Sequence, residues 1–462
     1  MNDVLGWLKE NEAAQTKALA DLVAIPSIST DGQHTSEIDQ SCELTCDLMK
    51  QSGLDKVQTL KCGDSYPYAY GEWLGAEGKP TVFLYAHHDV QPVNFPDQWE
   101  SDPWTLTERN GRLYGRGSAD DKGAIPVQLF AVAAFLKTRG SLPVNVKVLV
   151  EGEEEVGSAN LQSFFEQHKE QIKSDVIVVC DTENIDTGIP SITYSLRGVV
   201  TALVEVESAT TPVHSGMSGG MLADSALALN VILSRLYWDH GQIPIEGFYQ
   251  KVKPLTEQES KTFRSLPGNE AKWRAEMGVL PGVDFATQKG IHPYEQTWRQ
   301  PSITIIAQEA SSIASASNQV LPKARALVSC RIVPDQNPDE VFEQLQRTLT
   351  ANPPWNVKVN VTSAHTPVKW WMTDPNGPAF EAAMSALNQG FDREPVAIGC
   401  GGTIGFVGPL AELFEGAPAL LLGIEDPLTN AHAPNESLHA GDFRKLTVSL
   451  AHLFENLGTA QS

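Results

Sequence analysis

The sequence has few cysteines, few basic residues and no long apolar run. Its 462 residues include 6 cysteines, from Cys42 to Cys400, which favours free thiols in a reducing compartment over a disulfide framework. Its 34 Lys and Arg residues are outnumbered by 57 Asp and Glu residues, and a net charge of −23 argues against nucleic acids or an anionic membrane as partners. No apolar stretch approaches the roughly 20 residues of a membrane-spanning helix, and the acidic start does not resemble a secretory signal. We therefore expect a cytoplasmic globular protein with no membrane or nucleic-acid partner.

The first part of the chain alternates between extended and helical patterns. Buried strands are predicted at Thr81–Tyr85, Val144–Val150 and Asp175–Cys180. Helices are predicted at Gly123–Thr138 and from Ser158 onward, where serine is a favourable N-cap. Strands separated by helices predict an α/β domain with a doubly wound, mostly parallel sheet and helices on both faces.

The middle of the chain has a different pattern of predicted strands and helices, which we interpret as an α+β domain inserted into the first. The predicted elements are an extended stretch at Ser191–Glu207, helices at Ala223–Tyr237 and Pro338–Leu349, and strands at Ser302–Ala307 and Ala324–Val333. The doubly wound pattern then resumes, with a helix near Ala379–Gln389 and a strand at Ala419–Gly423. The predicted division assigns residues 1–196 and 372–462 to the first domain and residues 197–371 to the insertion.

Metal-type ligands recur where predicted strands end. They are His87 and Asp89, Asp120, Glu154 and Glu155, Asp181, and, after the last strand, His432. A single histidine is more often structural than a ligand, and an acidic run is usually a solvated loop. In open α/β sheets, however, reactive groups gather at the carboxyl ends of the strands. Two histidines and three carboxylates suit two divalent ions with one carboxylate shared.

The spacing suggests roles for some of these residues. His87 and Asp89 are two apart in extended chain, so their side chains point the same way, and a carboxylate beside a ligating imidazole fixes its tautomer. His88 is expected to point the opposite way. One of the adjacent Glu154 and Glu155 would bind metal while the other accepts a proton from activated water.

Three segments carry a family resemblance. YAHHDVQP at 85–92, GRGSADDKG at 115–123 and EGEEEVGS at 151–158 resemble the motifs of the M20 metallopeptidases. ITYSLRG at 192–198, HSG at 214–216 and SCRIVP at 329–334 also resemble that family's dipeptidase branch, which includes the carnosinase-like cytosolic non-specific dipeptidases. The resemblance implies metal-dependent hydrolysis of the amide bond of dipeptides, and it implies that the insertion is a lid and dimerisation domain.

The resemblance also implies individual roles around two divalent ions, Zn²⁺ or Mn²⁺. The implied metal ligands are His87, Asp120, Glu155, Asp181 and His432. Asp120 would bridge the two ions, and its bond to Asp121 would be a cis peptide. Glu154 would be the general base, and Asp89 would orient His87.

Contacts with a small peptide substrate are implied in the same way. His214 would reach the site of a partner subunit and stabilise the oxyanion, which implies a homodimer. Arg331 would hold the substrate's C-terminal carboxylate, and Asn318 would be another lid contact. Gly402 and Thr403 lie in a segment that resembles the glycine-rich loop meeting that carboxylate. Cys400 departs from the family, because related dipeptidases often have an acidic residue there.

Other functions fit the sequence less well. GMSGG at 216–220 has the form of a serine-hydrolase elbow, but Thr211 and Pro212 separate it from the preceding strand. The segment from Gly115 has Asp120 where a dinucleotide-binding fingerprint needs glycine. An N-acyl-amino-acid deacylase of the same family remains open, since the same water attack serves both reactions.

Overall fold

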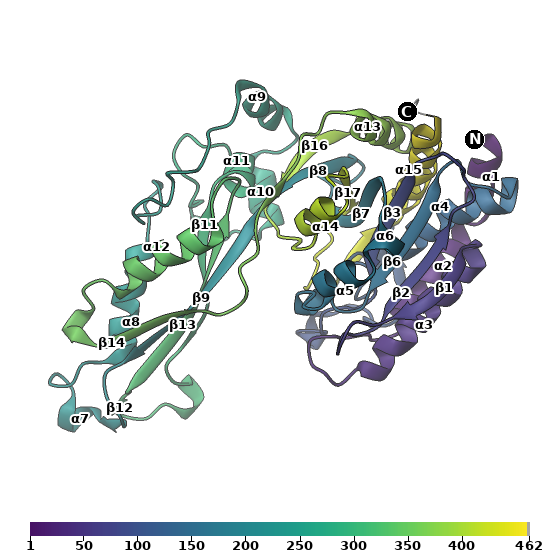
Figure 1. Cartoon of the computed structure of the whole chain (residues 1–462). Coiled ribbons are helices and arrows are strands. Elements are labelled where there is room, and N and C mark those ends of the chain that lie inside the picture. Colours follow the sequence, from purple (N-terminus) through teal and green to yellow (C-terminus); the bar gives the residue numbers. More distant parts are fainter. Residues whose placement is uncertain (460–462) are drawn as a thin grey trace.

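The computed structural model describes residues 1–459, and its larger lobe is built on a nine-stranded sheet (Figure 1). The strand order is β1-β2-β6-β3-β7-β17-β8-β15, with β16 paired to β8. The strands are β1 (Asp55–Leu60), β2 (Tyr68–Trp73), β3 (Thr81–His87), β6 (Asn145–Glu151), β7 (Val176–Glu183), β8 (Ser191–Leu196), β15 (Trp371–Met372), β16 (Val396–Cys400) and β17 (Ala419–Glu425). The central strands β6, β3, β7 and β17 are parallel, so their carboxyl ends meet at one edge of the sheet.

Helices cover both faces of this sheet. One face carries α1 (Asn2–Glu10), α2 (Glu12–Val23), α3 (Thr35–Ser52), α4 (Ala124–Arg139), α13 (Pro378–Phe391) and α15 (Ala440–Thr459), and the other carries α5 (Leu161–Gln167), α6 (Lys169–Ile172) and α14 (Val407–Leu413). Alternate residues of β3 serve the two cores: Leu84 packs in the first and Tyr85 in the second. Strands buried on both faces explain the continuous apolar runs in the sequence.

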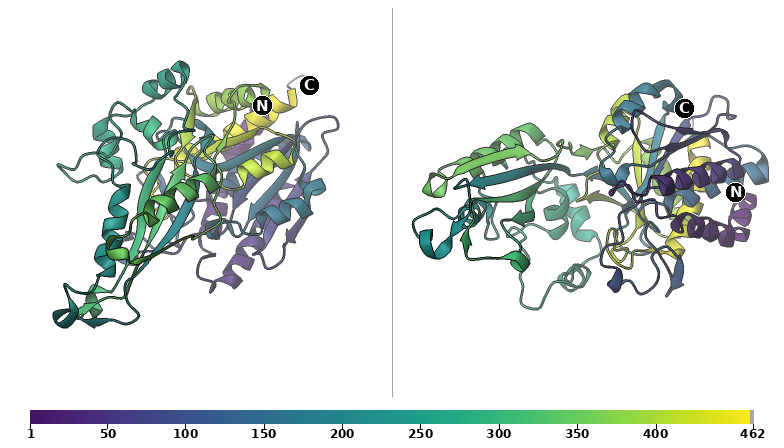
Figure 2. Two further views of the ribbon diagram at one scale, coloured as in Figure 1. Left: turned by 60° about the vertical axis from the view of Figure 1, so that its left-hand side comes forward. Right: turned by 90° about the horizontal axis from the view of Figure 1, so that it is seen from below.

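The inserted lobe has its own sheet and core. Its antiparallel sheet has the order β11-β13-β9-β14, with strands β9 (Gly198–Glu207), β11 (Ser302–Glu309), β13 (Lys323–Ile332) and β14 (Lys358–Ser363). Helices α8 (Ser225–Leu233) and α12 (Pro338–Thr350) pack on one face of this sheet. At its far end, β10 (Val213–His214) pairs with β12 (Gln319–Val320) beside the short helix α7 (Ser215–Ser218). Both views in Figure 2 place this tip far from the nine-stranded sheet.

The two lobes are joined at three places. The chain leaves the larger sheet after β8 and returns to it at β15. Between these points, α9 (Glu257–Ser265), α10 (Glu270–Glu276) and α11 (Pro293–Trp298) form a helical segment that reaches back to the larger lobe. Its Phe263 and Trp298 pack with Ile185 and Ile398 in a small core. Lys272 of α10 also forms an ion pair of 2.5 Å with Asp186.

The predicted fold class is confirmed, and two local predictions are wrong. The extended stretch at 191–207 is two strands, because the chain changes sheets at Arg197, between β8 and β9. Ser158 has a left-handed φ of 50°, and Asn160 instead occupies the N-cap position of α5. All six cysteines are free, as predicted. Across residues 1–459, we find no helix with the length and hydropathy to cross a membrane.

Candidate metal centre

Five of the predicted ligands lie together at the carboxyl edge of the larger sheet. They form two groups, His87 with Asp120 and Asp181, and Asp120 with Glu155 and His432, and in each group the ligand atoms lie within 4.8 Å of one another. Asp120 belongs to both groups. Its Oδ1 lies 3.1 Å from His87 Nε2 and its Oδ2 lies 2.8 Å from His432 Nε2. This is the arrangement expected of a carboxylate that bridges two cations.

Asp120 is fixed by its backbone rather than by its side chain alone. The buried Glu436 accepts hydrogen bonds from the backbone N–H groups of Gly117, Ala119 and Asp120, at 3.0–3.2 Å. Its other partner is Arg116, which forms a buried ion pair of 2.6 Å. Glu436 therefore ties the loop of Asp120 to the loop of His432. The peptide bond between Asp120 and Asp121 is cis, as the resemblance implied.

His87 is held by Asp89, which also positions the segment after β6. His87 Nδ1 lies 3.0 Å from the Asp89 backbone oxygen and 3.4 Å from its Oδ1, leaving Nε2 directed toward Asp120. The Asp89 carboxylate accepts from Ser29 Oγ and from the backbone N–H groups of Glu154 and Glu155. One buried carboxylate thus sets the orientation of a histidine and of two glutamates.

Glu154 and Glu155 begin the 3₁₀ turn η2 (Glu154–Val156), and they point to different partners. Glu155 accepts from Gln91 N and Nε2 and lies 3.3 Å from His432 Nε2. The Glu154 carboxylate has no hydrogen-bond partner among the described residues. Burial, together with the neighbouring carboxylates of Glu155, Asp120 and Asp89, raises the pKa of Glu154 to about 7.

The donor set fits divalent cations. Burial and the neighbouring Asp121 raise the pKa of Asp181 well above its usual range, and the Asp181 carboxylate also lacks a hydrogen-bond partner among residues 1–459. Four carboxylates, those of Asp120, Asp181, Glu154 and Glu155, therefore face only two imidazoles. Buried carboxylates are usually paired or bound to metal. Imidazole with carboxylate is a ligand set that Zn²⁺ and Mn²⁺ accept.

The predicted substrate residues separate into two places. Arg331, on β13, donates from Nη1 to Thr403 Oγ1 at 2.6 Å, and Gly402 lies in the same loop after β16. His214 and Asn318 instead lie side by side at the tip of the inserted lobe, where Ser215 N donates to the Asn318 oxygen. The tip, where α7 and β12 lie, is far from β3 and β7, which carry His87 and Asp181 of the same chain (Figure 1).

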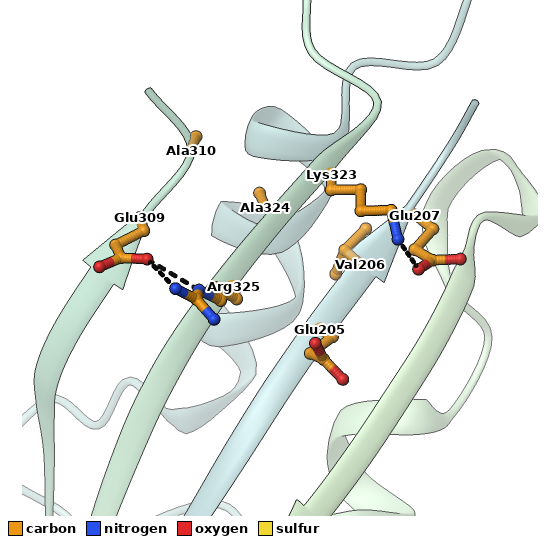
Figure 3. A pocket seen from close by; sticks show the side chains of 8 residues that line it. All are labelled: Glu205, Val206, Glu207, Glu309, Ala310, Lys323, Ala324 and Arg325. Carbon is orange, nitrogen blue, oxygen red and sulfur yellow. Dashed lines mark hydrogen bonds and ion pairs between the residues drawn. The ribbon is translucent and has the colours of Figure 1, made fainter. Parts of the chain in front are cut away.

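Two other features of the inserted lobe lie apart from the candidate metal centre. The GMSGG segment follows a strand of only two residues and belongs to the tip, so it lacks the strand that a nucleophile elbow requires. A cavity of about 240 Å³ opens between β9, β11 and β13 (Figure 3). Four of its charged side chains form ion pairs, Arg325 with Glu309 and Lys323 with Glu207, and the fifth, Glu205, accepts a hydrogen bond from Asn360.

Two residues that shape the site carried no clear sequence signal. Glu436 follows His432 by four residues, and only the folded loop shows that its oxygens face the Asp120 segment. Arg197 was part of a motif without an assigned role, yet its Nε donates to the Gly401 oxygen at 3.0 Å. In the sequence, the one hint of a role for Glu436 was its place in the same segment as His432.

The chain is similar to proteins of known family. Residues 83–456 match the family described as Peptidase family M20/M25/M40. The chain is 30% identical over 455 residues to the cysteinylglycine-S-conjugate dipeptidase of Corynebacterium striatum, covering 98% of this chain and 97% of that protein. It is 33% identical over 389 residues to the Beta-Ala-His dipeptidase of Homo sapiens, covering 81% of this chain and 74% of that protein.

A solved structure extends the similarity to three dimensions. The crystal structure of human carnosine dipeptidase 1 matches with a TM-score of 0.88 at 28% identity. The match covers 99% of this chain and 98% of that one, so it includes the inserted lobe as well as the larger sheet.

Proposed function

Because the chain belongs to peptidase family M20/M25/M40, we propose that it is a metal-dependent dipeptidase that uses the five clustered ligands. The observation that carries the proposal is Asp120, whose two oxygens face two different histidines. Dipeptidase names recur among the relatives that match nine tenths or more of the chain. A small peptide with both ends free is therefore the proposed substrate.

Two divalent cations, Zn²⁺ or Mn²⁺, complete the proposed site. His87, Asp120 and Asp181 would hold one ion, and Asp120, Glu155 and His432 the other. Bound cations would polarise the scissile carbonyl and lower the pKa of water toward neutrality.

The chain's own residues supply proton transfer and orientation. The carboxylate of Glu154 accepts a proton from the attacking water and later donates it to the leaving amine. No described residue forms a hydrogen bond with the Glu154 carboxylate, so it is free to accept and donate this proton. Gln91, in contrast, restrains Glu155. Asp89 keeps His87 in one tautomer and holds the backbone of both glutamates.

The C-terminal end of the substrate is proposed to bind at the loop after β16. We propose that Arg331 holds the C-terminal carboxylate and that Gly402 and Thr403 complete this contact. Arg331 already contacts Thr403, so the loop and the inserted sheet meet at this point. A guanidinium is suited to this task because its planar donors match a carboxylate.

We also propose a homodimer in which residues 197–371 act as lid and dimerisation domain, and residues 1–196 with 372–462 as catalytic domain. His214 and Asn318 directly precede α7 and β12, which lie at the far end of the inserted lobe, so they would need a large movement to serve the site of their own chain (Figure 1). Apolar side chains are exposed beside them: Met217 by 83%, Met221 by 87% and Ile313 by 96%. Ile305 and Ile306 are also exposed on β11, which is an edge strand.

A substrate panel tests the reaction class. The protein, loaded with Mn²⁺ or Zn²⁺, is assayed against dipeptides and against N-acyl amino acids with the same C-terminal residue. We expect cleavage of the dipeptides. Exclusive deacylation would instead identify an amidohydrolase of the same family. The six free thiols fit the reducing, cytoplasmic compartment that belongs to this proposal.

A further inference from the structure

Lys122 is a fully buried lysine two residues after Asp120. Its exposed fraction is 0%, and among residues 1–459 no carboxylate lies within ion-pair distance of its Nζ. Instead, Nζ donates to the backbone oxygens of Leu22 and Ile25, at 2.9 and 2.6 Å. Because burying an ammonium without a carboxylate partner costs free energy, these two contacts are what the buried lysine provides in return.

The two oxygens lie at the C-terminal end of α2 and directly after it, where backbone acceptors lack partners within the helix. A cation is favourable there, because the helix dipole places partial negative charge at this end. The stem of Lys122 passes Gly117, at which a Cβ would lie 3.2 Å from Lys122 Cδ and 2.5 Å from Val90 Cγ1. Lys122 thus joins the loop of Asp120 to the end of α2.

The segment that follows α2 runs beside the end of β3. Ser27 Oγ donates to the His88 oxygen at 2.6 Å, and the Ser27 oxygen accepts from Val90 N at 3.0 Å. Ser29 Oγ donates to Asp89 Oδ2 at 2.7 Å. Both serines are buried, so the Asp89 side chain rests on a segment that water does not reach.

Asp89 in turn contacts three residues of the candidate metal centre. Its backbone oxygen and Oδ1 lie near His87 Nδ1, and its carboxylate accepts from the backbone N–H groups of Glu154 and Glu155. A displacement of the segment after α2 would therefore reach a proposed ligand and the proposed base together. Ile25, which accepts from Lys122, is only four residues before the serine that contacts Asp89.

We propose that Lys122 is a positioning residue, which acts through residues 25–29 to hold the Asp89 carboxylate against His87 and the two glutamates. This inference rests on the proposed function and adds to it a residue that contacts neither the ligand atoms nor the substrate. Lys122 makes the loop of Asp120 and the support of Asp89 one mechanical unit.

The first test is kinetic, with Lys122→Met, which removes the donor but keeps an unbranched stem. At saturating metal, we expect kcat for the dipeptide that is cleaved fastest to fall about 10-fold or more, while KM stays within about 2-fold, since the change affects the support of the site and not a substrate contact. A purely structural role would lower stability and leave kcat of the folded protein unchanged. Unchanged kcat would overturn the proposal.

Ser29→Ala removes the last contact of the same connection, and it is expected to lower kcat similarly. Because the two residues act in series, the double variant is expected to lie within about 3-fold of the slower single variant. Losses that multiply in the double variant would show that Lys122 does not act through Ser29, and would contradict the proposal.

A matched control is Lys147→Met. Lys147 is also buried, on β6, and its Nζ likewise donates to a backbone oxygen, that of Lys173, at 2.6 Å. It has no contact with the segment after α2 among its hydrogen bonds. This variant is expected to lose stability but to keep the kcat of the wild type. A fall in kcat equal to that of Lys122→Met would refute a specific role for Lys122.

Hydrogen exchange tests the same connection without the reaction. In the Zn²⁺-loaded protein, the backbone N–H groups of Glu154 and Glu155 are expected to exchange about 10-fold faster in Lys122→Met than in the wild type, because their acceptor Asp89 is less well held. Lys147→Met is expected to leave these rates unchanged. If no dipeptide is cleaved, the proposed function fails, while faster exchange still supports the positioning role. Equal rates in Lys122→Met and the wild type would refute it. If Lys122→Met does not fold, Lys122→Gln, which keeps an N–H donor, is measured in its place and the same outcomes decide.

Discussion

Glu154 and Glu155 are adjacent in the sequence, but their carboxylates have different surroundings. Glu155 is restrained by Gln91 and lies near His432, whereas Glu154 has no hydrogen-bond partner among the described residues. The spacing alone left either glutamate as the base, and the family resemblance implied Glu154. The contacts of the folded chain favour Glu155 as a ligand and Glu154 as the proton acceptor.

The substitution Glu154→Gln tests this division. It preserves the side-chain volume but removes the basic carboxylate, so kcat is expected to fall at least about 100-fold. Elemental analysis is expected to find the metal content of the wild type. The matched variant Glu155→Gln is expected to lose metal instead. A fully active Glu154→Gln enzyme would disprove the base assignment.

Glu436 illustrates what could not be predicted from single positions. Its importance depends on three backbone donors from residues 117–120, more than 300 positions earlier in the chain. The clustering of the five proposed ligands was predictable because each follows a strand or lies in a recognisable motif. Supporting hydrogen bonds have no such pattern, since they depend on how two distant loops meet.

For Glu436→Gln we expect the affinity for Mn²⁺ or Zn²⁺ to fall by about 10-fold or more, as is typical when support of a ligand is lost. The variant keeps the shape of the side chain but removes the charge that faces Arg116. Competition with a chromophoric chelator measures the affinity. Glu415→Gln, at an exposed site paired with Lys173, is the control and is expected to bind metal normally. Unchanged affinity in Glu436→Gln would contradict the role given to Glu436.

Among the helices, α13 and α15 approach each other closely, and a glycine makes this approach possible. A Cβ on Gly390 would lie 2.1 Å from Ser449 Oγ and 2.8 Å from the Lys445 backbone oxygen. The helix at α13 was predictable from its apolar spacing, but the contact with α15 was not. Periodicity identifies a buried face without naming the element that covers it.

We expect Gly390→Ala to lower the free energy of unfolding by about 1–3 kcal/mol, because the methyl group would overpack the contact. Gly6→Ala is the control, since Gly6 lies inside α1 with nothing within 4 Å of the added Cβ. There the better helix propensity of alanine is expected to stabilise the protein by roughly 0.5–1 kcal/mol. Urea denaturation measures both variants. A neutral Gly390→Ala would show that the helices move apart easily.

The inserted lobe gives the whole molecule its elongated shape (Figure 2). His214 directly precedes α7, which lies at the end of the molecule opposite the larger sheet (Figure 1). The presence of an inserted lobe was predictable from the change in the pattern of strands and helices along the chain. The return of α9–α11 to the larger lobe was not, because the polar region from 238 to 300 shows little periodicity. Phe263 and Trp298 make that contact with the larger lobe.

Mixing two inactive variants tests whether His214 serves a partner subunit. Co-expressed His214→Ala and Glu154→Gln chains would form mixed dimers in which one site has both an intact Glu154 and the partner's His214. We expect activity to recover to a sizeable fraction of the wild type, although each variant alone is nearly inactive. Absence of recovery in purified mixed dimers would contradict the proposed exchange.

The proposed metal centre requires that Asp120 be shared by two cations. The decisive measurement is the metal content per chain, by elemental analysis after loading with Mn²⁺ or Zn²⁺ and desalting, of the wild type and of Asp120→Asn. We predict two ions per chain in the wild type and fewer than one in the variant, because both groups of ligands include Asp120. One ion or none in the wild type, or two ions retained by Asp120→Asn, would contradict the account.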